Sequence, residues 1–145
     1  MGNTKAKVRL ALLSGLGALV LAGSALQAGV ANASTISGSW SLTAVLEATH
    51  NTASITTNST HEVSGCVSVT STAGVGGVWS FELIWYDGGQ NKVLWHSGDH
   101  EGNARVCSPI EKPGGNDKVY DHIILINDGN GLEVTDSGAW SLDNY

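Results

Sequence analysis

Basic residues are scarce in this sequence, and phosphate-binding patterns are missing. Lys and Arg account for seven of the 145 residues, whereas Asp and Glu account for 13, and the net charge is −6. A nucleic-acid site needs a basic face that displaces counterions from phosphates, so this balance argues against nucleic acid as a partner. The Gly-x-x-x-x-Gly-Lys-Ser/Thr pattern of a phosphate-binding loop is absent, and no motif indicates a cofactor.

Cysteine is equally scarce, because only Cys66 and Cys107 are present. They lack a Cys-x-x-Cys spacing, and two cysteines in an exported domain favour one disulfide over two free thiols or a metal pair. The predicted bridge closes a 41-residue loop, worth about 4 kcal/mol on the chain-entropy model. Cys66 is out of phase with Val67 and Val69, so it either faces the less buried side of its strand or follows a bulge.

A long apolar run occurs only near the N-terminus. Three basic residues between positions 5 and 9 precede a Leu-, Ala- and Gly-rich stretch to about residue 30, and residues 31–33 read Ala-Asn-Ala. This pattern predicts a secretory signal peptide over 1–33, with an uncleaved membrane anchor as the alternative. Cleavage leaves 34–145 as one domain of 112 residues with a net charge of −9. We therefore expect a secreted, extracellular, acidic protein that does not associate with membranes.

Helical periodicity is missing from the rest of the chain. No window combines apolar residues at i, i+3, i+4 and i+7 with helix caps. Short alternating segments instead predict seven or eight strands, and residues 49–62 form a loop or a polar edge strand. The predicted strands cover 39–46, 63–70, 78–86, 92–96, 104–107, 119–126, 132–134 and 139–142. This pattern is typical of an all-β antiparallel sandwich or small barrel.

The clearest strand spans 78–86. Its core face is predicted to hold Trp79, Phe81, Leu83 and Trp85, which alternate without a break. A glycine-containing turn over 87–91 then predicts a β-hairpin with the next strand. Two further strands have apolar patterns: Trp40, Leu42, Ala44 and Leu46 share one face, and the continuous apolar run 123–126 predicts a strand covered on both faces.

A short internal echo links the two ends of the domain. Residues 37–42 read Ser-Gly-Ser-Trp-Ser-Leu and residues 137–142 read Ser-Gly-Ala-Trp-Ser-Leu, so five of six positions agree. The structural interpretation is that two strands place Trp and Leu in a shared core. Chance similarity is the alternative in a chain so rich in Ser and Gly, and the echo is too short for a repeat protein.

The candidate binding residues lie around the predicted hairpin. The five Trp residues sit in alternating strands, which favours core packing over a row of exposed rings that stack on sugars. Tyr86 and His96 are out of phase with this core pattern and are candidates for a contact surface, together with Asp99 and His100. The segment 96–101 holds two His and two carboxylates, but its spacing favours a solvated loop over a metal site.

Catalytic patterns are weak. A Gly-x-Ser-x-Gly elbow is absent, although Glu82, Asp121 and Glu133 remain a hypothetical carboxylate set for glycoside hydrolysis. We therefore expect a non-catalytic, monomeric domain that binds an extracellular protein or polysaccharide through loops or an exposed sheet face. The alternatives are an inhibitor of an extracellular hydrolase that acts through residues 109–117 and, third, a small secreted hydrolase.

Overall fold

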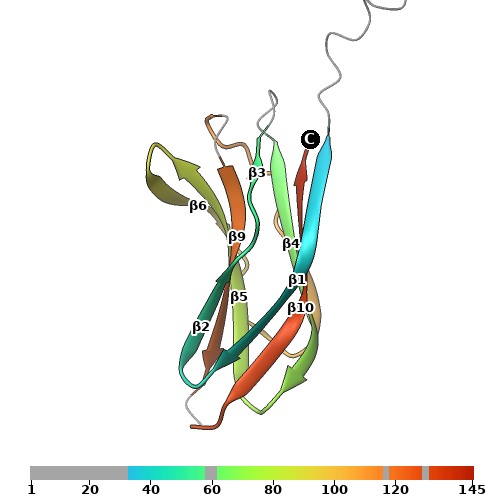
Figure 1. The fold of residues 1–145 in the computed structure, drawn as a ribbon, viewed down its shortest axis with the longest axis vertical. Helices are drawn as coiled ribbons and strands as arrows, with labels where there is room; N and C mark the ends of the chain where they lie inside the picture. Colours follow the sequence, from blue (N-terminus) through green and yellow to red (C-terminus); the bar gives the residue numbers. More distant parts are fainter. Residues whose placement is uncertain (1–32, 58–61, 116–117, 129–130) are drawn as a thin grey trace, which may run out of the picture. The chain divides into compact units, whose positions relative to one another are not determined.

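Two antiparallel sheets pack face to face as a β-sandwich in a computed structural model of the chain (Figure 1). The structure describes residues 33–57, 62–115, 118–128 and 131–145, so the predicted signal peptide lies outside the described residues apart from Ala33. All regular secondary structure within those ranges is β-strand. The described residues contain no helix that is long and apolar enough to cross a membrane. The prediction of an all-β antiparallel sandwich is confirmed.

Ten strands in the described ranges make up the two sheets. Sheet A has the order β1 (Ser34–Ala44), β10 (Val134–Asn144), β4 (Val63–Ala73) and β8 (Ala104–Cys107). Sheet B has the order β2 (Glu47–Asn51), β9 (Lys118–Asn127), β5 (Gly77–Asp87) and β6 (Gln90–His96). Two short strands join sheet B at its sides: β3 (Ile55–Thr56) pairs with β9, and β7 (His100–Glu101) pairs with β5.

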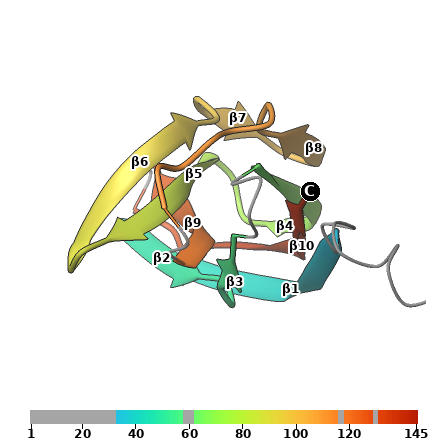
Figure 2. The same ribbon diagram turned by 90° about the horizontal axis from the view of Figure 1, so that it is seen from above.

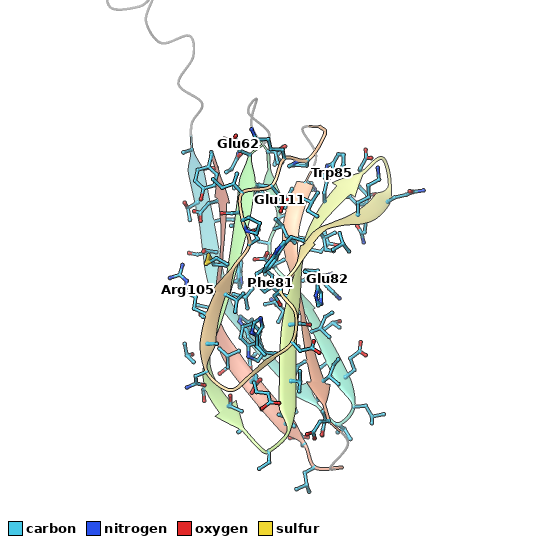
Figure 3. The ribbon with its side chains drawn as sticks, turned by 180° about the vertical axis from the view of Figure 1, so that it is seen from behind. Glu62, Phe81, Glu82, Trp85, Arg105 and Glu111 are labelled. Carbon is cyan, nitrogen blue, oxygen red and sulfur yellow. A yellow bond between two sulfur atoms is a disulfide. The ribbon has the colours of Figure 1, made fainter. Side chains whose placement is uncertain are left out.

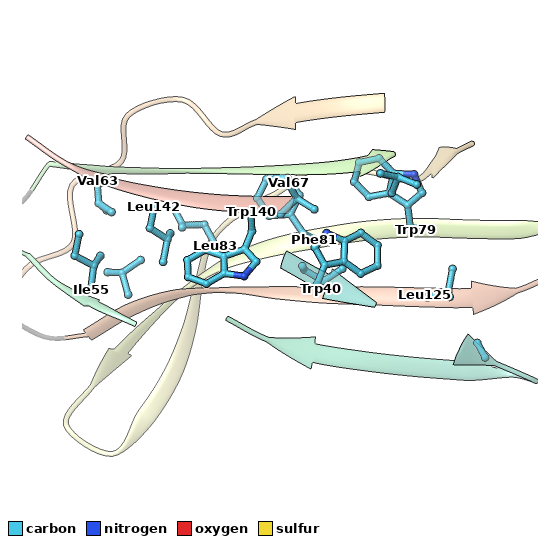
Figure 4. Packing of buried hydrophobic residues seen from close by; sticks show 14 residues of the cluster. Trp40, Ile55, Val63, Val67, Trp79, Phe81, Leu83, Leu125, Trp140 and Leu142 are labelled. Carbon is cyan, nitrogen blue, oxygen red and sulfur yellow. The ribbon is translucent and has the colours of Figure 1, made fainter. Parts of the chain in front are cut away.

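Alternation places one side of each long strand in the core. Trp40, Trp79, Phe81, Leu83 and Trp140 lie between the sheets, and Figure 4 shows these side chains packed along the sandwich. Burial of such large apolar side chains is the main stabilising contribution to a domain of this size. The prediction that the Trp residues belong mainly to the core agrees with this packing.

Several predicted details are wrong at the ends of strands. Leu46, predicted to share the strand face of Trp40, is 75% exposed because β1 ends at Ala44 and Leu46 lies in the following turn. Trp85 is only partly buried, because β5 is leaving the sandwich there to enter its hairpin. The run 123–126 is fully covered on one face only, because it alternates like the other strands: Ile123 and Leu125 are fully buried between the sheets, whereas Ile126 on the outer face is 40% exposed.

The C-terminal part also differs from the prediction. Residues 139–142 belong to one continuous strand, β10, whereas Leu132 lies in the preceding turn and is exposed. Part of that predicted turn, residues 129–130, lies outside the described residues. The segment 49–62, predicted as a loop or a polar edge strand, holds the last three residues of the edge strand β2 and the short strand β3, with loop residues between them, as far as the structure describes it.

The internal echo marks two neighbouring strands. In the ladder between β1 and β10, Ser39 lies opposite Ala139, Gly38 opposite Trp140, and Trp40 opposite Gly138. A Cβ atom on Gly38 would lie 2.8 Å from the Trp140 ring. The indole of Trp140 therefore fits against β1 only because Gly38 has no side chain. The two similar segments therefore pair antiparallel with each other, each Trp facing the glycine of the other.

The Cys66–Cys107 disulfide joins β4 to β8. The two residues are direct partners in the ladder, and their Cα atoms are 4.0 Å apart. Cys66 points to the outer side of sheet A, because Val63, Val67 and Val69 face the core. The first of the two sequence-based options is therefore correct. The bulge of β4 lies further along, between its pairings with Ser137 and Gly138.

We expect Gly38→Val to lower the free energy of unfolding by about 2 kcal/mol, because its side chain would overlap the Trp140 indole. Ser39→Val is the matched control, since Ser39 is the next residue, points outward and is exposed. The control should change stability by less than about 0.5 kcal/mol. Urea unfolding followed by Trp fluorescence measures both values, and equal stability of the two variants would contradict the packing described for Gly38.

Candidate functional site

An open groove crosses the outer face of sheet B. One hollow of about 510 Å³ is lined by Asn51, Thr52, Ser54, Tyr86, Asn91, Lys118 and Tyr120. A second hollow of about 260 Å³ is lined by Asn51, Glu82, Ile84, Asn91, Val93, Tyr120 and His122. The two hollows share Asn51, Asn91 and Tyr120 and therefore adjoin. We call the combined feature the sheet B groove.

Strand register arranges the outward-facing residues of β2, β9, β5 and β6 around the groove in three rows across the sheet. The first row is polar and contains His96, Glu82, His122 and Asn51. The second row contains Val93, Ile84 and Tyr120, and the third contains Asn91, Tyr86 and Lys118. An apolar and aromatic row thus lies between hydrogen-bonding groups on both sides.

Hydrogen bonds fix the far wall of the groove. The Nδ1 atom of His122 lies 2.5 Å from the Oδ1 atom of Asn51, which joins β9 to β2 through their side chains. The Thr52 amide donates to the carbonyl of Asp121 at 3.0 Å, and the Asp121 amide donates to the Thr52 hydroxyl at the same distance. Thr52 and Asn51 are therefore held in place against β9 before any ligand arrives.

Tyr120 lies at the centre of the groove. Burial raises the pKa of its hydroxyl, and the negative charge of Glu82 raises it further. The hydroxyl therefore remains protonated at neutral pH and is able to donate a hydrogen bond. Figure 3 shows Phe81 between the sheets and Glu82 on the solvent side of the same strand, as the alternation of β5 requires.

The hairpin of β5 and β6 forms the other wall. It projects away from the body of the sandwich (Figures 1 and 2). Its turn contains Gly88 and Gly89, whose φ angles of 57° and 93° are accessible to glycine at little cost. Lys92 forms an ion pair with Asp87 and lies 5.0 Å from the centroid of the Trp85 ring. These contacts brace the part of the hairpin that carries Tyr86.

The structure separates the four predicted binding residues. Tyr86 and His96 both lie on the outer face of sheet B, Tyr86 in the groove and His96 in the row of Glu82. His100 instead packs against Trp79, with ring centroids 4.9 Å apart, and its Nε2 atom lies 3.1 Å from the Ser97 carbonyl oxygen. Asp99 is exposed in the connection between β6 and β7. These four residues therefore do not form one cluster.

The chemically reactive groups are also dispersed. Glu82 faces the groove, Asp121 is fully buried in the core, and Glu133 lies in the turn before β10. These three carboxylates, considered above as a hydrolase set, therefore do not meet. Among the described residues, no group of three or more His, Cys, Asp or Glu side chains is placed to hold a metal ion.

Asp121 is a carboxyl group inside an apolar core. It occupies a core-facing position of β9 between Val119 and Ile123, and a Cβ atom on Gly65 would lie 2.2 Å from its Oδ1 atom. Neither carboxyl oxygen has a hydrogen-bond partner among the described residues. Burial raises the pKa of Asp121 to about 8, so the core holds it in its neutral form below that pH.

The pH dependence of stability should report on Asp121. Because the folded-state pKa is raised from 3.8 to about 8, stability is greatest below the unfolded value and is lost as the pH rises towards 8. Each pH unit in that range lowers the free energy of unfolding by up to about 1.4 kcal/mol. We expect Asp121→Asn to reduce this slope between pH 5 and pH 8 in urea titrations; a smaller slope remains, because burial also raises the pKa of Asp136.

Asp99→Asn is the control for this measurement, because Asp99 is exposed. It should leave the slope of stability against pH as it is in the unmodified protein. An Asp121→Asn variant with an unchanged slope would show that the buried carboxyl does not titrate in this range.

A tethered loop follows the disulfide. Val63 and Glu111 exchange two backbone hydrogen bonds of 2.9 and 2.7 Å, and the Ser108 amide donates to the Gly65 carbonyl at 2.8 Å. Between these anchors, Ile110 is 53% exposed. The predicted inhibitory segment 109–117 thus contains a fixed loop with an exposed aliphatic side chain, although residues 116–117 lie outside the described residues.

Most of the groove was not predicted from the sequence. Asn51 was assigned to a polar loop or edge strand, and Tyr120 and His122 were included in a strand expected to be covered on both faces. The alternation of Tyr120 and His122 with Val119, Asp121 and Ile123 was the available signal for an exposed polar side. That signal was outweighed by the apolar run that follows.

Comparisons with known proteins do not assign a family or a function to the chain. A scan against protein-family models and searches of curated proteins and of solved structures found no match to the chain.

Proposed function

We propose that the chain is a secreted, non-catalytic domain that binds a neutral polysaccharide in the sheet B groove. The observation that carries this proposal is the groove itself: two tyrosines lie beside amide, imidazole and carboxylate side chains in a hollow that crosses four strands. Sites of this kind combine an apolar surface with a few directed polar groups.

The chemistry of the lining suits a sugar chain. The C–H groups on one side of a pyranose ring pack against aromatic rings such as those of Tyr86 and Tyr120. Asn51 and Asn91 each offer both a donor and an acceptor, which matches neighbouring sugar hydroxyls. Because adjoining hollows extend the groove over several strands, an extended chain fits it better than a single sugar.

Charge favours a neutral polymer. The predicted mature chain carries a net charge of −9, which opposes binding of acidic polysaccharides at a distance. Within the groove, Glu82 adds a negative charge and Lys118 adds a positive one, so the local charges balance. A polymer bound by hydroxyl contacts and ring stacking is consistent with both features.

Two observations support export to an extracellular compartment. The Cys66–Cys107 disulfide is compatible with an oxidising environment outside the cell. In addition, β1 begins at Ser34, directly after the predicted cleavage site, so cleavage would remove no residue of the described sheets. Export would bring the groove into contact with extracellular polysaccharides.

Affinity electrophoresis in gels that contain xylan, glucomannan or mixed-linkage glucan tests the proposal. We expect at least one of these neutral polymers to retard the protein, whereas polygalacturonate should not. Tyr86→Ala and Tyr120→Ala should each weaken the retardation by about tenfold, because each removes a stacking surface. The melting temperature of Tyr86→Ala should stay almost unchanged, since Tyr86 is 44% exposed.

Tyr145→Ala is the matched control, because Tyr145 is 40% exposed but lies outside the groove. It should bind as the unmodified protein does. Failure of all neutral polymers to retard the protein, or an equal loss of binding in the Tyr145 control, would contradict the proposal.

Inhibition of an extracellular hydrolase is the second candidate function. Its support is the loop with exposed Ile110, which is tethered on both sides and follows Cys107 directly. A loop held in one conformation loses little entropy on binding and therefore inserts readily into an active site.

Titration against a panel of secreted proteases and glycosidases distinguishes the two candidates. If the loop is inhibitory, one equivalent of protein abolishes the activity of a target enzyme, and Ile110→Asp removes this effect. Leu46→Asp should have no effect, because Leu46 is exposed in the turn between β1 and β2, away from this loop. An absence of stoichiometric inhibition across the panel would eliminate this candidate.

A further inference from the structure

The outer edge of β1 is a long strand edge without protection. β1 pairs with β10 over all 11 of its residues without a register shift, and no other strand of the described residues pairs with it. Every second residue of such an edge directs its N–H and C=O groups away from the sheet. β1 contains no charged residue and no proline, which are the usual features that keep edge strands apart.

The other three edges of the sandwich are protected. β2 has five residues and contains Glu47, and β8 has four residues and contains Arg105. β6 contains Lys92, and its register with β5 shifts after Leu83, which bends it away from a straight edge. Only β1 therefore combines length, regularity and absence of charge among the described edges.

The sequence of β1 is complementary to itself in the antiparallel direction. Within the chain, the segment Ser-Gly-Ser-Trp-Ser-Leu of β1 already pairs with the similar segment of β10, with Ser39 opposite Ala139 at the centre. Ser39 is the middle residue of the 11 in β1. The same register between two copies of β1 therefore places Ser39 of one copy opposite Ser39 of the other, and Gly38 opposite Trp40. Trp40 donates to the Ser68 carbonyl on β4 and so leans away from the free edge.

We propose that the free edge of β1 pairs antiparallel with β1 of a second copy, so that two sheets A become one continuous sheet. A two-fold axis at Ser39 relates the copies, which makes the contact closed and isologous. The sequence alone favoured a monomer, since the composition of the whole chain does not reveal which strand forms an edge.

Side-chain pairing supports this register. On the outer face it places Thr35 opposite Thr43 and Ser37 opposite Ser41, and hydroxyl pairs of this kind stabilise neighbouring strands. The chain already contains one such pair, since the Thr43 and Thr135 hydroxyls lie 2.8 Å apart. On the inner face, Ile36 pairs with Leu42, and both side chains are only partly buried in the single chain.

Self-complementarity of β1 selects a second copy as the occupant, and the charge distribution is compatible with this pairing. The predicted mature chain carries a net charge of −9, so two copies repel each other wherever acidic surfaces meet. Pairing along β1 brings no charged side chain of one strand opposite a charged side chain of the other. It is therefore the edge at which self-association meets the least repulsion.

Sedimentation equilibrium of the disulfide-bonded protein, residues 34–145, tests the proposal. We expect a reversible monomer–dimer equilibrium, and Ser39→Lys should weaken it by about tenfold or more because two like charges would lie directly opposite each other. Ala139→Lys is the matched control: Ala139 is exposed on the same face, one strand in from the edge, and should leave the equilibrium unchanged. An equimolar mixture of Ser39→Lys and Ser39→Glu should restore the dimer mass.

Hydrogen exchange of the unmodified protein locates the contact without any variant. Exchange of the outward-directed amides of β1 should slow as the protein concentration rises, while exchange in β6 and β8 should not. A protein that stays monomeric at its solubility limit overturns the proposal. A dimer in which the exchange of β1 amides does not depend on protein concentration also overturns the proposal. A dimer that Ala139→Lys weakens as much as Ser39→Lys does has the same consequence.

Discussion

The pairing of β1 with β10 is the contact on which the rest of the sandwich depends. It joins the first and last strands of the described chain over 11 residue pairs and places Trp40 and Trp140 side by side in the core. β10 also pairs with β4, so both sides of the last strand are occupied. Sheet A is therefore completed only when the C-terminal strand inserts between β1 and β4, which makes the contacts of this sheet long-range in sequence.

The two sheets of the sandwich differ in what their outer faces offer. Sheet A presents Ser and Thr hydroxyls along β1 and carries the disulfide on its outer side, beside a hollow of about 220 Å³ that lacks tyrosines and is lined mainly by small side chains. Sheet B presents tyrosines, amides and imidazole groups, and its projecting hairpin makes the outer face concave. The same alternating pattern that fills the core thus places mainly small side chains on the outer face of sheet A and an aromatic and polar groove on that of sheet B.

The sequence predicts those parts of the fold that the alternation of apolar and polar residues along each strand determines. The core face of 78–86, the hairpin, the disulfide and the all-β class follow from period-two patterns, turn glycines and cysteine spacing. The groove could not be derived in this way, because its residues come from four strands whose order in the sheet is not encoded locally. Tyr86 was identified because it breaks the phase of a strong strand, whereas Asn51 gains its role only from its position opposite His122. The similarity of the segments around Trp40 and Trp140 was visible in the sequence. Only the register between β1 and β10 shows that the two segments pair with each other.

The two proposals combine in a specific way. A two-fold axis perpendicular to the extended sheet A keeps both copies of sheet B on the same side of the dimer, so the two grooves face the same direction. The β1 edge and the groove use no common residue, and pairing therefore leaves both grooves open. A polymer carries many equivalent sites, and attachment of one groove raises the effective concentration of the second. Weak contacts in each shallow groove would then yield firm attachment to a polysaccharide, whereas a short oligosaccharide that fills only one groove would gain nothing from the dimer.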